Sequence, residues 1–107
     1  PLQAVGQIEG GITQGLGLAV LEELVMKNGV IQNANFTDYL LPTALDTPPI
    51  EIAALIEEPE PGAPFGAKGI GEPPTISSTP AVVAAIRDAT GVDLRRVPVR
   101  PEDIALE

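Results

Sequence analysis

The sequence contains no cysteine, no histidine and no tryptophan. Without cysteine the chain can form neither a disulfide nor an iron–sulfur site of its own. Without histidine as well, the usual zinc and non-haem iron sites are excluded. This composition is compatible with a reducing compartment, and we expect a cytoplasmic protein.

Basic residues are also scarce. The chain carries 6 lysines and arginines against 15 aspartates and glutamates, which gives a formal charge of −9. Affinity for nucleic acids and for anionic membrane surfaces comes largely from neutralising phosphates with basic side chains. We therefore expect no nucleic-acid partner. A membrane partner is equally unexpected, because Glu22 and Glu23 interrupt the apolar run at residues 16–26 and leave it too short to span a bilayer.

Aromatic residues are few, since Phe36, Tyr39 and Phe65 are the whole set. Apolar residues nevertheless make up 44% of the 107 positions, so the core of this single domain must be aliphatic. The 12 prolines and 11 glycines exceed the usual share and indicate long, shaped connections between few regular elements.

The clearest periodic pattern predicts a helix through residues 8–24, with an apolar residue at every fourth position: Ile8, Ile12, Leu16, Val20 and Leu24. Few polar residues interrupt it, so we expect this helix to be buried on most sides. Lys27 and the left-handed pair Asn28-Gly29 are expected to end it. Four glycines within it (10, 11, 15 and 17) each weaken a helix by about 1 kcal/mol relative to alanine. Close approach of another backbone or of a ligand would offset that cost.

The remaining elements are shorter. Strands or extended segments are expected at 30–36 and 50–57, a long Gly/Pro loop at 65–78, and a last helical turn at 102–106. A second helix, capped by Ser78 or Thr79 with Pro80 near its first position, should end at Thr90-Gly91. The predicted fold class is α+β, with two main helices packed on a small sheet.

One acid stands out within the long loop. Residues 65–74 read Phe-Gly-Ala-Lys-Gly-Ile-Gly-Glu-Pro-Pro, so three glycines precede Glu72 and two prolines follow it. Glycines allow close approach of a backbone, and Pro73 should bias Glu72 towards an extended conformation. Such a segment could present one carboxylate in a fixed direction, although an isolated glutamate in a loop is more often simply solvated.

Three segments in this order carry a family resemblance. Gly6-Gln7-Ile8-Glu9-Gly10-Gly11 comes first, Asp38-Tyr39-Leu40-Leu41-Pro42-Thr43 follows, and residues 66–74 complete the set. Together they resemble the C-terminal part of the molybdenum-binding (molybdopterin) subunit of the xanthine dehydrogenase and aldehyde oxidase family. The similarity covers nearly the whole chain, from about Val5 to Ile104.

The resemblance implies a molybdenum hydroxylase, an oxidoreductase that hydroxylates an aldehyde or an N-heterocycle such as a purine with water as oxygen source. It implies that Glu72 is the general base and that Gln7 binds the pterin cofactor, with no metal ligand from this region. The implied cofactor is molybdenum-molybdopterin, with its cytosine dinucleotide form left open. Iron–sulfur and FAD groups would lie on other domains or subunits.

The resemblance further implies that residues 1–107 are the C-terminal segment of the second molybdopterin-binding domain, within a longer polypeptide. Expected partners are the remainder of that subunit, the iron–sulfur and flavin subunits or domains, and a small-molecule substrate. The isolated chain should bind no molybdenum and be inactive. A rival interpretation makes the chain a non-catalytic domain for packing or subunit contact, and the substrate itself stays open.

Overall fold

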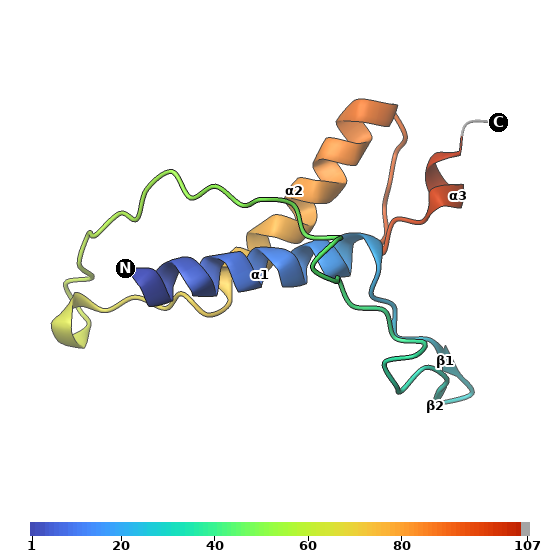
Figure 1. The fold of residues 1–107 in the computed structure, drawn as a ribbon, viewed down its shortest axis with the longest axis horizontal. Coiled ribbons are helices and arrows are strands. Elements are labelled where there is room, and N and C mark those ends of the chain that lie inside the picture. The colour runs from blue at the N-terminus through green and yellow to red at the C-terminus, as the bar shows by residue number, and fades with distance from the viewer. Residues whose placement is uncertain (106–107) are drawn as a thin grey trace.

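The computed structural model describes residues 1–105. Its elements are α1 (Leu2–Val20), β1 (Met26–Lys27), β2 (Val30–Ile31), the 3-10 helix η1 (Pro64–Gly66), α2 (Pro73–Thr90) and α3 (Pro101–Ile104). Helices and an antiparallel two-stranded sheet together confirm the α+β class. The packing differs from the expectation, because α1 and α2 contact each other while the hairpin projects away from both (Figure 1).

Helix α1 ends at Val20, earlier than predicted. The backbone N–H groups of Leu21 and Glu22 both donate to the carbonyl oxygen of Gly17, each over 2.8 Å, and the chain then leaves the helix axis. Only small residues of α1 are buried, namely Gly11, Gly15, Gly17 and Ala19. The expectation of a helix buried on most sides is therefore wrong for this chain, since its larger apolar residues are half-buried or exposed.

The Asn28-Gly29 pair forms the turn of the hairpin instead of a helix cap. Both residues have positive φ, 51° and 77°, and they connect Lys27 to its strand partner Val30. Two-residue hairpin turns need this left-handed geometry at both central positions, and Asn-Gly supplies it readily. The left-handed conformation was predicted correctly, whereas its role was not.

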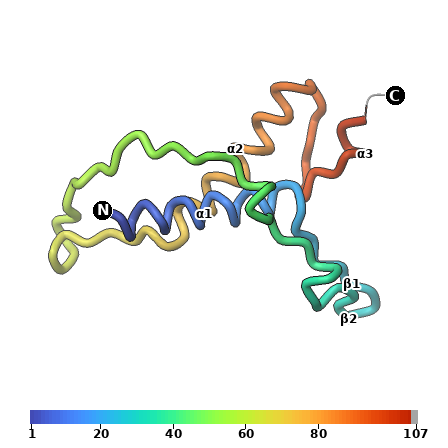
Figure 2. Tube along the Cα trace, viewed as in Figure 1, coloured from blue at the N-terminus to red at the C-terminus, as the bar shows by residue number. Residues whose placement is uncertain are grey.

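A long connection, residues 32–72, joins the hairpin to α2, and we call it the excursion. Figure 2 traces it away from the helices and back along the start of α1, with only η1 as regular structure on the way. The predicted strand at 50–57 is wrong, and the one at 30–36 shrinks to Val30–Ile31. A strand requires a hydrogen-bonded neighbour, and within residues 1–105 the segment 50–57 has none.

Helix α2 begins at Pro73, several residues before the predicted start. Pro73 and Pro74 occupy its first turn, where the backbone N–H groups they lack would have no partner inside the helix. Pro80 lies within the helix rather than at its beginning. The predicted end is confirmed, because Gly91 adopts the left-handed conformation and donates its N–H to the carbonyl of Arg87 over 2.8 Å.

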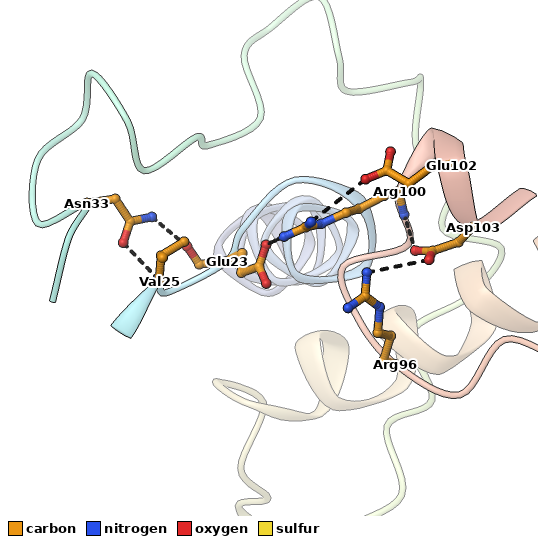
Figure 3. Close-up of polar contacts among 7 residues, drawn as sticks. All are labelled: Glu23, Val25, Asn33, Arg96, Arg100, Glu102 and Asp103. Carbon is orange, nitrogen blue, oxygen red and sulfur yellow. Dashed lines mark hydrogen bonds and ion pairs between the residues drawn. The ribbon is translucent and has the colours of Figure 1, made fainter. Parts of the chain in front are cut away.

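The C-terminal segment is fastened to the end of α1. The N–H of Val99 donates to the carbonyl of Ala19 over 2.7 Å, and both residues are buried. The Arg100 guanidinium pairs with Glu23 and with Glu102, as Figure 3 shows. The predicted last turn is confirmed as α3, although Leu106 lies outside the described residues.

Asn33 is buried and joins the two sides of the hairpin base. Its Oδ1 accepts the N–H of Val25 over 2.9 Å, and its Nδ2 donates to the carbonyl of Glu23 over 2.6 Å (Figure 3).

Among residues 1–105, no helix is both long and apolar enough to cross a membrane.

Candidate functional site

The two candidate residues, Gln7 and Glu72, come together at one place on the helix pair. Gln7 Nε2 donates a hydrogen bond to the carbonyl oxygen of Gly71 over 3.2 Å. Gly71 directly precedes Glu72, so a contact across 64 residues of sequence fixes the backbone that carries the acid. The structure thereby places the first glycine motif beside the second.

Glu72 occupies the N-cap position of α2 rather than the middle of a loop. Its carbonyl accepts the N–H groups of Thr75 and Ile76 over 3.0 and 3.1 Å, which begins the helix. Its backbone is helical, with φ −101° and ψ −31°, so the extended conformation expected before Pro73 is wrong. The preference against helical geometry before proline is moderate, and the two hydrogen bonds to the Glu72 carbonyl outweigh it. The side chain is exposed and makes no capping hydrogen bond.

Two glycines explain how α2 can approach α1 so closely. A Cβ on Gly11 would lie 2.7 Å from Cβ of Pro74, and one on Gly15 would lie 2.9 Å from Cβ of Ser78. Carbon atoms do not approach each other so closely without a bond. The expectation that a neighbouring backbone offsets the helix cost of these glycines is confirmed for Gly11 and Gly15. Gly10 has no such neighbour within 4 Å.

Hydroxyl groups of α2 use the space that the glycines leave. Thr75 Oγ1 donates to the carbonyl of Gly11 over 3.1 Å, and Thr79 Oγ1 donates to the carbonyl of Gly15 over 2.9 Å. Like the contact of Gln7, each joins residues 64 apart, so the two segments run alongside each other in one constant register. This register sets where Glu72 lies relative to α1.

Glu72 opens onto a pocket of about 260 Å³, lined by Gln14, Gly71, Glu72, Thr75 and Ile76. Gln14 comes from α1 and contacts Thr75, whose Oγ1 lies 3.4 Å from Gln14 Oε1. The sequence alone gave Gln14 no role and did not single out Thr75. The four-residue spacing from Gly11 to Gly15 and from Thr75 to Thr79 was the available signal, but it becomes meaningful only once the two helices are paired.

The residues around Gln7 fit a pterin as a hydrogen-bonding partner. A pterin edge presents donors and acceptors side by side, and an amide offers both. Gln7 is exposed and uses one N–H on Gly71, and no hydrogen bond within residues 1–105 reaches its Oε1. Gly69 and Gly71 have no atom within 4 Å of the place a Cβ would occupy, so their backbone is open to a neighbour. Within the described residues, no group of three potential metal-binding side chains is present.

Comparison with known proteins places this geometry in a family. Residues 1–48 match the profile of the molybdopterin cofactor-binding domain. The chain is 41% identical over 104 residues to the xanthine dehydrogenase molybdenum-binding subunit of Escherichia coli O157:H7, covering 95% of this chain and 14% of that protein. It is 38% identical over 102 residues to the aldehyde oxidoreductase of Megalodesulfovibrio gigas, covering 92% and 11%.

A solved structure agrees with these relatives. Quinoline 2-oxidoreductase from Pseudomonas putida 86 superposes with a TM-score of 0.86 at 42% identity, over 97% of this chain and 14% of that one. The predicted family resemblance is confirmed. The chain belongs to the family of the molybdenum-binding subunits of xanthine dehydrogenases and aldehyde oxidases. It spans only 14% of the length of the first of these relatives.

Proposed function

We propose that this segment forms one wall of the molybdenum site in a larger molybdenum hydroxylase, with Glu72 as the general base. The observation that carries the proposal is the hydrogen bond from Gln7 to Gly71, because it joins the predicted pterin-binding amide to the residue directly before the predicted base. The proposed substrate is an N-heterocycle such as a purine, or an aldehyde. Water is the oxygen source.

The roles divide between the two residues. Gln7 would hold the pterin through its free Oε1 and its second N–H, while its first N–H keeps Gly71 in place. When bound, the molybdenum-molybdopterin cofactor supplies the electron-accepting chemistry of the hydroxylation. Glu72 would accept, on a carboxylate oxygen, a proton from the water that supplies the oxygen, which requires the carboxylate to lie within hydrogen-bonding distance of that proton. The α2 N-terminus fixes the backbone of Glu72 for this purpose.

The partners follow from the surface that this chain leaves uncovered. Large apolar side chains are exposed along the hairpin and the excursion, among them Met26 (60%), Val30 (61%), Phe36 (82%) and Ile56 (81%). We interpret this exposed apolar surface as a region that another part of the protein covers. We assign it to the remainder of a molybdenum-binding subunit, which would in turn work with iron–sulfur and flavin subunits or domains. The second molybdopterin-binding domain and a cytoplasmic location are part of the same proposal.

The test is Glu72→Gln in the complete molybdenum-binding subunit, assembled with its partners and assayed with xanthine, quinoline and benzaldehyde. Loss of a general base should lower kcat by about 10²–10⁴-fold, while molybdenum content stays unchanged. Glu51→Gln, at an exposed residue of the excursion, is the matched control and should leave kcat unchanged.

The same variant separates this proposal from the packing alternative. A non-catalytic segment predicts that Glu72→Gln impairs assembly or molybdenum content, or that it has no effect. A near-normal kcat with full molybdenum content would rule out Glu72 as the base.

A further inference from the structure

We infer that Gln14 is a binding residue of the Glu72 pocket, donating a hydrogen bond from Nε2 to an acceptor atom of the substrate, and that Thr75 positions it. This inference rests on the proposed function, because it concerns the same pocket. It adds to Glu72 a second polar group, Gln14 of α1, that contacts the same substrate.

Gln14 lies on α1 where α2 approaches it. It precedes Gly15 and follows Gly11 by three residues, so it lies on α1 beside the two glycines at which α2 makes its closest approach. Its side chain lines the same pocket as Glu72, and the two come from different helices. Binding sites commonly use a few polar groups that converge on one pocket from separate elements.

Thr75 orients the Gln14 amide. Thr75 Oγ1 lies 3.1 Å from the Gly11 carbonyl and 3.4 Å from Gln14 Oε1, so its hydroxyl is shared between two acceptors. The amide oxygen thereby has a partner. No hydrogen bond within residues 1–105 uses Gln14 Nε2, so both of its hydrogens remain available to the pocket.

The hydrogen-bonding groups of Gln14 and Glu72 are complementary. An ionised Glu72 only accepts hydrogen bonds, whereas Gln14 Nε2 only donates them, so the pocket offers both kinds of group. At about 260 Å³ it has room for one small ring or part of a larger ring system. A ring nitrogen or a carbonyl oxygen is the acceptor that Gln14 would bind, and N-heterocycles and aldehydes carry such atoms.

The test uses Gln14→Met in the complete enzyme, which keeps the length and helix preference of the side chain but removes the amide. The substrate is whichever of xanthine, quinoline and benzaldehyde the parent enzyme oxidises with the highest kcat/KM. We expect kcat/KM to fall about tenfold, carried mainly by KM, with molybdenum content and Tm unchanged. In the Glu72→Gln background, where turnover is blocked, the Kd of the same substrate should rise by the same factor.

The role of Thr75 can be tested with Thr79 as the matched control. Thr75→Val and Thr79→Val each remove one hydroxyl bonded to an α1 carbonyl, but only Thr75 lines the pocket. Thr75→Val should raise KM, Thr75→Ser should restore it, and Thr79→Val should lower Tm without changing KM. Because Thr75 acts through Gln14, Thr75→Val should add nothing to KM in the Gln14→Met background.

Three outcomes would overturn the inference. One is a KM and Kd within twofold of the parent in Gln14→Met, and another is loss of molybdenum in that variant. The third is a Thr75→Val variant that matches Thr79→Val in every measurement. If Glu72→Gln abolishes turnover while Gln14→Met behaves normally, only this inference fails. A normal rate in Glu72→Gln instead removes the proposed function beneath it.

Discussion

The middle of α1 and its C-terminal end are held in different ways. Along its middle, at Gly11 and Gly15, α1 meets α2 through backbone atoms and short side chains with no charged group between them. At its C-terminal end, the backbone bond from Val99 to Ala19 is joined just beyond Val20 by longer side chains from other segments, where Tyr39 bonds Glu22 and Arg100 pairs with Glu23. A contact between backbones fixes a register and tolerates no added atom. A contact between long side chains can adjust, and solvent competes with it.

The largest effect is expected from breaking the close contact with Gly15→Ala. The new Cβ would lie 2.9 Å from Ser78 Cβ and 3.0 Å from the Thr75 carbonyl oxygen, so the helices must separate. We expect a destabilisation of about 2–3 kcal/mol, measured by thermal melting of the complete subunit. Gly10→Ala is the control. It meets no atom within 4 Å and should stabilise by up to about 1 kcal/mol, and equal effects of the two variants would contradict the comparison.

A moderate effect is expected from Tyr39→Phe at the other end. The Tyr39 hydroxyl donates to Glu22 Oε2 over 2.7 Å, and this bond, aided by partial burial and the carboxylate charge, raises the pKa of Tyr39 above its usual 10.0. The contact should contribute about 1 kcal/mol.

The stability that the Tyr39–Glu22 contact contributes depends on pH, and the direction of this dependence follows from the raised pKa of Tyr39. Because the protonated phenol is the form that the fold favours, the contribution is complete below pH 10 and is lost as pH rises through the higher folded-state pKa. The Tm difference between the parent and Tyr39→Phe should therefore be constant from pH 7 to 9 and shrink above 10. A difference that persists unchanged at the highest pH would contradict this assignment.

The smallest effect is expected from Arg100→Gln. The side chains of Arg100 and Glu23 are 39% and 38% exposed, so solvent screens their attraction. We expect a loss of about 0.5 kcal/mol at low salt that disappears near 1 M NaCl, measured by Tm. Arg95→Gln removes a more exposed pair with Asp93, remote from α1, and should change nothing. A salt-independent loss in Arg100→Gln would show that the guanidinium acts through packing instead.

The elements that sequence reasoning predicted correctly are those fixed by neighbouring residues. Gly91 ends α2 because a left-handed residue after the last helical turn is a local requirement. Asn28-Gly29 has the left-handed geometry that its composition favours, yet a hairpin turn and a helix end both accept that geometry. The conformation of the pair was therefore predictable, whereas its role depended on whether the chain had already left α1.

The errors arise where distant residues decide. Ser78 and Thr79 resemble N-caps, but the Thr79 hydroxyl bonds the Gly15 carbonyl on another helix, and α2 already begins at Pro73. The contact of Gln7 with Gly71 could not be read from either motif alone. The family resemblance named both residues as parts of one site, while their roles as base and pterin ligand stay predictions.

The constant offset of 64 residues between α1 and α2 has a consequence for biosynthesis. Closing a loop of that length costs about 4 kcal/mol in chain entropy before any contact forms. During translation α1 emerges well before α2, so it must wait, with its glycine face uncovered, until residues beyond Thr90 have left the ribosome. The acid and the amide that we place at one site can therefore meet only after α2 has been synthesised, so a cofactor could bind between them only once the growing chain extends past Thr90.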